Sequence, residues 1–380
     1  MKPSKRLMHL DFMLILILFI LGSISIVAIS SATYTSDSSY VEKQIGWYIL
    51  GFLCMLSFLL FDLKILSQGR FLYLLYIVGI LLLILVFVPG LGVKVKGAQQ
   101  WIRIGSFQLQ PSELMKLIFI LLFGKVLAER SGFYGERLRD LGKLFILLVI
   151  PFLIILSQPD LGTALVFIAI TVSMCWIAGM PRRWFLTGIL TLVLSVGSVF
   201  TLYFTDHPFL QIILKDHQIK RIETFVNPAA DPTGAGYQLT QAKIGIGSGS
   251  FLGKGWHQGT QVQGNWIPEP HNDFIFAVFA EEFGFLGASL VIVLFLLMIY
   301  RMIMIAFHAE DPFQRFVVTG VIGMISFQVI QNIGMTVGLL PITGLPLPFI
   351  SYGGSSLVTQ MIGIGFVLNV GIHQQRGLIF

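Results

Sequence analysis

The chain has 380 residues, of which 55% are hydrophobic and only 12% are charged, and its mean hydropathy is +0.84. Soluble domains are usually about 45–50% apolar and about 25% charged, so this composition predicts an integral membrane protein. It argues against a nucleic-acid-binding protein, a secreted disulfide-bonded scaffold and a disordered linker. The two cysteines, Cys54 and Cys175, lie in apolar runs without partners at metal-ligand spacing, so no zinc site is predicted.

Long apolar segments predict membrane-spanning helices. Crossing a hydrocarbon core of about 30 Å takes roughly 20 apolar residues, and unbroken apolar stretches do not match the alternation of a β-barrel strand. The spans are predicted at residues 10–31, 45–62, 71–88, 113–128, 144–158, 162–179, 185–204, 274–307, 316–340 and 355–371. We therefore expect an all-α polytopic membrane protein of about ten transmembrane helices, forming a single domain over residues 1–380.

The basic residues predict the orientation of these spans. The formal net charge is +6, and most Lys and Arg residues fall in segments on the N-terminal side of the spans. The positive-inside rule assigns that side to the cytoplasm, so both termini of this cytoplasmic-membrane protein are expected there. The opposite, extracytoplasmic side carries loops at about 89–112, 205–273 and 341–354. Functional residues are expected in these three loops.

Three local patterns predict special structure. The last loop is rich in Pro and Gly yet apolar, which indicates a re-entrant segment buried among helices. Within 274–307, Glu281-Glu282-Phe283-Gly284 interrupts the apolar run and predicts a broken helix that keeps both carboxylates away from lipid. Residues 208–226 alternate apolar and charged residues at helical spacing, which is typical of a helix lying in the membrane surface.

Asp273 is the first candidate for chemistry because it ends the long loop directly before an apolar helix. Aspartate at a helix start is ordinarily a capping residue. Glu269 and His271 precede it and Glu281 follows within the apolar run, which is a density of titratable groups that capping does not need. On these residues alone, both the capping and the functional interpretation stay open.

Two further groups of charged residues lie toward the same side. Lys94, Lys96 and Arg103 accompany Trp101 in the loop at 89–112, and Lys116 follows it. Anchoring at the membrane interface and binding of an anionic ligand explain these residues equally well. Asp160 lies in a Pro-Asp-Leu-Gly turn, where an ordinary turn role is favoured over a functional one.

Separated motifs, in order, resemble the SEDS family of bacterial membrane proteins, which comprises RodA, FtsW and SpoVE. The motifs lie at residues 97–102, 110–116, 158–163, 268–274, 281–282 and 351–355. The short N-terminus and Gly344-Leu345-Pro346-Leu347-Pro348 are more similar to the rod-shape members than to the division members. Two departures stand out, since Asn272 replaces the usual Thr and Gln100 a common Arg.

The resemblance implies a peptidoglycan glycosyltransferase for cell elongation and shape. Such an enzyme polymerises lipid II on the outer face of the membrane by inverting transfer and releases polyprenyl diphosphate. It works with a class B penicillin-binding protein, a transpeptidase, and with other elongation-complex membrane proteins. In the family's pattern the catalytic acid falls on Asp273 and a functionally important Trp on Trp101.

The mechanism implied needs a base for the acceptor hydroxyl and cations for the departing diphosphate. The residues expected to contact the substrate are Trp101, Lys94, Lys96, Arg103, Glu113, Lys116, Asp160, Lys243, Lys254, Glu269, His271, Glu281 and Ser351. No cofactor is required and no protein metal site is predicted, although a Mg²⁺ or Mn²⁺ ion could be held through the diphosphate. The alternatives are a lipid-linked precursor flippase, a division or sporulation paralogue, and a scaffold without chemistry.

Overall fold

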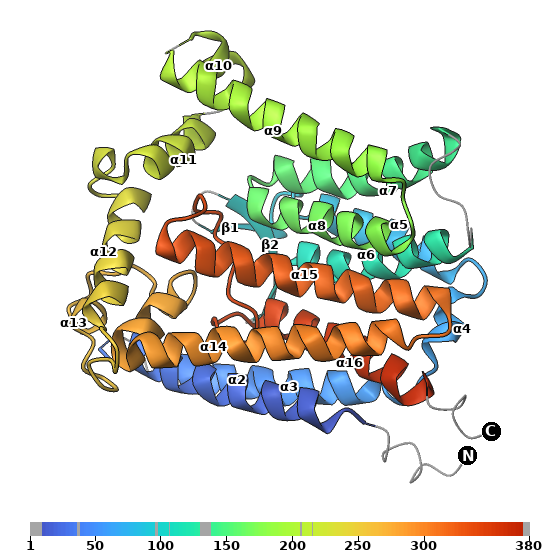
Figure 1. Ribbon diagram of the computed structural model, residues 1–380, viewed down its shortest axis with the longest axis horizontal. Coiled ribbons are helices and arrows are strands. Elements are labelled where there is room, and N and C mark those ends of the chain that lie inside the picture. The colour runs from blue at the N-terminus through green and yellow to red at the C-terminus, as the bar shows by residue number, and fades with distance from the viewer. Residues whose placement is uncertain are drawn as a thin grey trace.

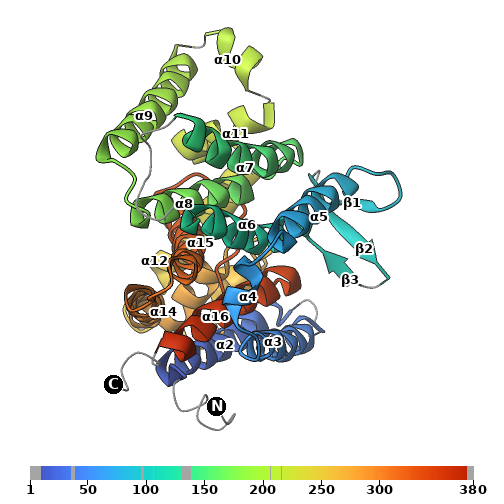
Figure 2. The ribbon, with the colours of Figure 1, turned by 90° about the vertical axis from the view of Figure 1, so that its right-hand side faces the viewer.

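The computed structural model describes residues 10–35, 39–95, 98–105, 107–129, 138–205, 207–214 and 216–374, and they form a helical bundle with one small sheet (Figures 1 and 2). The α-helices are α2 (Phe12–Ala32), α3 (Ser39–Ser57), α4 (Leu63–Ser67), α5 (Phe71–Leu85), α6 (Pro111–Ala128), α7 (Leu138–Ser157), α8 (Leu161–Ile177), α9 (Arg182–Phe204), α10 (Phe209–Ile213), α11 (Asp216–Val226), α12 (Ala235–Ser248), α13 (Thr260–Gln263), α14 (Ile275–Phe307), α15 (Pro312–Val337) and α16 (Gly354–Gln374). A 3₁₀ helix, η1, covers Pro228–Ala230.

Every predicted span falls on a helix, so the expected all-α membrane fold is confirmed. In the described ranges, five helices are long and apolar enough to cross a membrane, namely α2, α9, α14, α15 and α16. Shorter apolar helices fall on α5, α7 and α8. The count of ten crossings stays a prediction. Figure 1 shows that α2 begins and α16 ends at the same end of the bundle, as an even number of crossings requires.

In the segment at about 89–112, expected only as a loop, three strands form an antiparallel sheet of order β1-β2-β3. Its strands are β1 (Gly92–Val95), β2 (Ala98–Ile104) and β3 (Phe107–Leu109). Gly92 lies opposite Ile102, and Ile102 lies opposite Leu109. Apolar and polar residues alternate only over Val93-Lys94-Val95 and Ile102-Arg103-Ile104, which is too short a period-two pattern to predict a strand by itself. Figure 2 shows the sheet projecting from the bundle beside α5.

The predicted break in the long apolar helix is confirmed at Gly284, where φ is 64° and ψ is −162°. This backbone conformation is essentially restricted to glycine. A neighbouring loop satisfies the amide groups that the break frees, because Phe285 N donates to Ser250 O (2.9 Å) and Leu286 N donates to Phe251 O (3.2 Å). The break therefore leaves no polar backbone stranded in the apolar interior.

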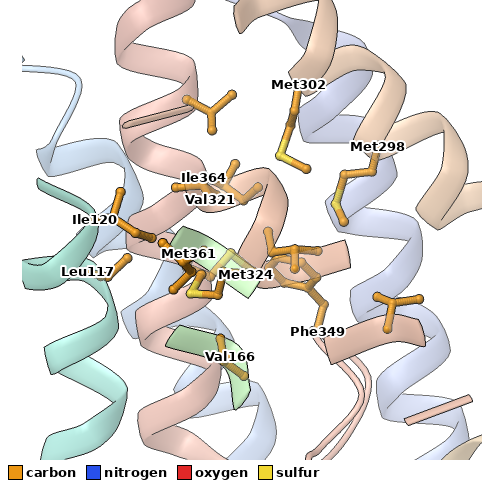
Figure 3. Packing of buried hydrophobic residues seen from close by; sticks show 14 of the residues in the cluster. Leu117, Ile120, Val166, Met298, Met302, Val321, Met324, Phe349, Met361 and Ile364 are labelled. Carbon is orange, nitrogen blue, oxygen red and sulfur yellow. The ribbon is translucent and has the colours of Figure 1, made fainter. Parts of the chain in front are cut away.

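The hydrophobic core lies between helices that are distant in sequence. Figure 3 shows Leu117 and Ile120 of α6 close to Met324 of α15 and Met361 of α16. These four side chains are buried, and Phe349, from the segment between α15 and α16, reaches the same core. This non-helical segment is thus part of the interior and not a surface turn.

Most residues of the predicted re-entrant segment at 341–354 are buried or half-buried, and only Pro341 and Gly344 are exposed. The backbone polar groups of this segment are bonded by side chains of surrounding helices, as Ser25 Oγ donates to Ile350 O (2.7 Å) and Gln331 Nε2 donates to Pro341 O (2.9 Å). Phe349 N donates to Gln360 Oε1 (3.0 Å). Irregular backbone is tolerated at membrane depth only when protein satisfies it in this way.

The predicted surface helix at 208–226 is wrong as one continuous element, because it is divided into α10 and α11. The two helices are separated at Leu214, whose backbone is extended (φ −112°, ψ 142°). Helix α9 before them has no buried residue, and Figure 1 shows α9 and α10 standing away from the body of the bundle. Helix α11 leads the chain back to α12.

Candidate active site

Asp273 lies in the turn before α14 and is half-buried. The N-cap position of α14 falls on Phe274, which makes no side-chain capping hydrogen bond. Asp273 therefore lies one residue before the assigned N-cap position.

The backbone around Asp273 is held by the re-entrant segment. Tyr352 N donates to His271 O (3.0 Å), and Ser351 Oγ donates to Asn272 O (2.7 Å). The same Ser351 hydroxyl oxygen accepts from the backbone N–H of Leu347 (2.8 Å). The structure thus places Ser351 as a support for the residue next to Asp273.

Asn332 of α15 completes this support. Its Nδ2 donates both to Asp273 O (2.9 Å) and to Leu345 O (2.8 Å). The loop then passes beside the carboxylate itself, because a Cβ built on Gly344 would lie 3.7 Å from Asp273 Oδ2. Three successive carbonyl groups, at residues 271–273, are therefore fixed without using the Asp273 carboxylate. Such a supporting shell is what a reactive side chain needs for a fixed position.

Asp160 lies on the other side of the same loop. It is the N-cap of α8 and accepts from Thr163 N (2.9 Å), which confirms its expected turn role. Its second oxygen accepts from Gln110 Nε2 (3.2 Å). The adjacent Gly162 packs directly against Leu345. Residues 343–345 are therefore in contact with both the Asp160 turn and the Asp273 carboxylate.

A buried ion pair stands behind Asp160. Lys116 Nζ lies 2.8 Å from Glu113 Oε1, and the two residues are 0% and 2% exposed. Burial raises the pKa of Asp160, and the Glu113 carboxylate adds to this rise, while hydrogen bonds from Thr163 and the charge of Lys116 oppose it. The motifs at 110–116 and 158–163 therefore meet in one charged cluster.

Arg221 joins this cluster and was not among the residues expected from the sequence. Burial lowers the pKa of its guanidinium, and the nearby carboxylates of Asp160 and Asp273 oppose this effect. Arg221 belongs to α11, where it follows Lys220 in an amphipathic pattern. In such a pattern a single cation is indistinguishable from its solvent-facing neighbours, so the sequence carried no signal for it.

Lys254 and Glu281 meet in a separate buried cluster. Their side chains form a 2.6 Å ion pair, and Glu281 Oε1 also accepts from Gln261 N (3.0 Å) and from Thr260 Oγ1 (3.2 Å). Glu281 lies eight residues beyond Asp273 on α14, which corresponds to about 12 Å of helix. This cluster attaches the 249–263 segment to the break in α14.

The structure places the remaining predicted residues on several different elements. Trp101 is half-buried and Arg103 is exposed on β2, and Lys243 is exposed and lies over Gly338, where α15 ends. The ring of His271 lies 4.6 Å from that of Tyr40. Glu269 is half-buried in the turn before it. Lys96 and the side chain of Lys94 lie outside the described residues.

We expect Asp160→Asn to stabilise the protein increasingly as the pH rises. Because the pKa of Asp160 is raised in the folded state, folding takes up a proton between the ordinary pKa of about 3.9 and the raised pKa. Between these two pKa values the folded wild type holds about one proton more than the unfolded chain. Its unfolding free energy therefore falls by about 1.4 kcal/mol for each pH unit. Asn keeps the capping hydrogen bond and cannot ionise.

Unfolding of both proteins in detergent at pH 4, 6 and 8 measures this effect. The difference in unfolding free energy should grow from pH 4 upward in favour of the variant. A difference that is the same at all three pH values would contradict the assigned environment of Asp160.

Residues 6–376 match the family model of the cell cycle proteins FtsW, RodA and SpoVE. The chain is 35% identical to stage V sporulation protein E of Bacillus subtilis, over 96% of this chain and 98% of that protein. It is also 35% identical to the peptidoglycan glycosyltransferase MrdB of Escherichia coli K12, over 98% of both chains.

A solved structure has the same fold over nearly the whole chain. It is a chain from a peptidoglycan synthase complex that coordinates polymerisation and crosslinking, and it matches with a TM-score of 0.81 and 30% sequence identity. The match covers 96% of this chain and 98% of the other.

Proposed function

The chain belongs to the FtsW, RodA and SpoVE family, and we propose that it joins lipid II units into glycan strands, with Asp273 as the general base. As a member of this family it is a peptidoglycan glycosyltransferase, the activity named in its relative MrdB. The observation that carries the proposal is the support around Asp273. Its backbone is fixed by Ser351, Tyr352 and Asn332 beside a cluster of buried charges.

The reaction is a single displacement at the donor sugar. Asp273 takes the proton from the acceptor hydroxyl, whose oxygen forms a bond to C1 of the donor sugar. The bond from C1 to the phosphate oxygen breaks on the opposite face, and its electron pair leaves with polyprenyl diphosphate. A positioned carboxylate that accepts this proton typically contributes about 10²–10⁴-fold to the rate.

A divalent cation would have to be held largely by the substrate. Among the residues that the structure describes, no three His, Cys, Asp or Glu residues come together as a metal site. These residues do not fit an all-protein cage for Mg²⁺ or Mn²⁺, which would instead bind through diphosphate oxygens. Proton transfer to Asp273 does not depend on such an ion.

The proposal also covers the partner protein and the orientation of the chain in the membrane. The similar structure comes from a complex that couples polymerisation to crosslinking, which supports a class B penicillin-binding protein as the partner. The basic residues support cytoplasmic termini and an active site on the outer face of the cytoplasmic membrane. The Gly344–Pro348 segment favours a role in elongation over division or sporulation.

The test is polymerisation by the purified protein. Lipid II is incubated with the protein alone and with a class B penicillin-binding protein, and the products are separated on a gel. We expect a ladder of glycan strands. The same preparation in vesicles is assayed for lipid II scrambling. Scrambling without any polymer, under both conditions, would overturn the proposal in favour of a flippase.

A further inference from the structure

Arg221 carries a hydrogen-bond donor that the described structure leaves unused. Its Nη1 atom is buried and has no hydrogen-bond partner among the described residues. One turn farther along α11, Thr224 is 4% exposed, whereas the adjacent Lys220 is exposed. Arg221 thus lies on the face of α11 that packs inward. An unpaired, buried N–H of a charged group costs free energy unless a ligand supplies the acceptor.

Among the described residues, the cations predicted from the sequence are engaged or placed elsewhere. Lys116 is paired with Glu113 and fully buried, and Lys254 is paired with Glu281. Lys243 lies at the end of α15, and Arg103 is exposed on the sheet. Arg221, by contrast, stands close enough to Asp160 and Asp273 to feel both carboxylates.

We propose that Arg221 binds the diphosphate of the lipid-linked donor and stabilises the charge that develops there as the bond to C1 breaks. The proposal rests on the proposed function, since it assumes that Asp273 accepts the proton in the same step. A guanidinium suits this task because its planar N–H groups can hold two phosphate oxygens at once, which a Lys ammonium cannot do in the same way.

Asp273, which would act on the acceptor hydroxyl, and Arg221, which would bind the departing diphosphate, are carried by different parts of the fold. Asp273 is fixed by α15 and the re-entrant segment, whereas Arg221 arrives on α11 from the long loop. The base and the leaving-group cation therefore come from independent elements. An inverting displacement needs the base and the leaving-group cation on opposite faces of the sugar, and two separate elements can supply them from two directions.

The test compares Arg221→Met and Arg221→Lys with Lys220→Met, a matched control that removes the neighbouring exposed charge. Initial rates of lipid II polymerisation are measured with and without added polyprenyl diphosphate. We expect Arg221→Met to lower kcat about 10²-fold, the usual effect of removing one donor to a developing anion. Inhibition by polyprenyl diphosphate should weaken at least about tenfold, the factor that follows from 1.4 kcal/mol of lost binding. Arg221→Lys should lie between, and Lys220→Met should match the wild type.

The pH profile gives a readout that a purely structural role would not move. Removing a cation beside Asp273 raises the pKa of that carboxylate, so the acidic limb of kcat/KM should move to higher pH in Arg221→Met. Unchanged product inhibition and an unchanged limb would overturn the proposal. If Arg221→Met does not fold, Arg221→Lys decides, and wild-type product inhibition in that variant would overturn it. If the Arg221 variants overturn this role but the Asp273→Asn protein is inactive, the proposed function of the chain is retained.

Discussion

Asp273→Asn is expected to lower the rate of lipid II polymerisation by roughly 10²–10⁴-fold, because an amide cannot accept the proton of the acceptor hydroxyl. The variant should fold normally. The contacts that hold this turn use the carbonyl groups of residues 271–273, and the assigned N-cap of α14 is Phe274. Loss of the charge therefore removes the base without removing the support.

The measurement is the initial rate of glycan formation by purified wild-type and variant protein, with thermal unfolding as the check on folding. Glu42→Gln is a matched control, because Glu42 is an exposed carboxylate at the start of α3. Asp273→Glu keeps a base but displaces it by about 1 Å, so we expect an intermediate loss of about 10²-fold. A folded Asp273→Asn protein that polymerises at the wild-type rate would remove Asp273 from the mechanism.

The fold could be predicted from the sequence where burial in lipid dominates. Apolar runs of about 20 residues specify helices because no other single segment satisfies its own backbone in hydrocarbon. The break at Gly284 was equally predictable, since two carboxylates in an apolar run need protein partners. The sheet at 92–109 and the helix α12 were not predicted, because outside the membrane hydropathy no longer decides between strand, helix and loop.

The candidate site was predictable in its acids and not in its cations. Asp273 and Asp160 stand in motifs with several special residues close together in the sequence. The sequence does not show which carboxylate a Lys or Arg side chain will pair with. In the structure, Lys116 is paired with Glu113 and Lys254 with Glu281. Arg221 reaches the site only through the path of the long loop, a tertiary feature that no local pattern encodes.

Lys116→Met should destabilise the protein by about 3–5 kcal/mol, the usual cost of leaving a buried charge without its partner. The ion pair is enclosed, with Lys116 and Glu113 at 0% and 2% exposure, and Glu113 Oε2 has no other hydrogen-bond partner among the described residues. Removing Lys116 alone would therefore strand the carboxylate in the interior.

The double variant Lys116→Met/Glu113→Gln removes both charges and should recover most of the lost stability, because a neutral pair of similar volume carries no such penalty. Unfolding free energies of the single, double and wild-type proteins in mixed micelles check this expectation. A single variant as stable as the wild type would contradict the buried pair. Polymerisation by the double variant then separates two roles for Lys116. A stable protein with normal rates makes the pair purely structural, whereas a stable protein that is slow gives at least one of the two charges a role in the reaction.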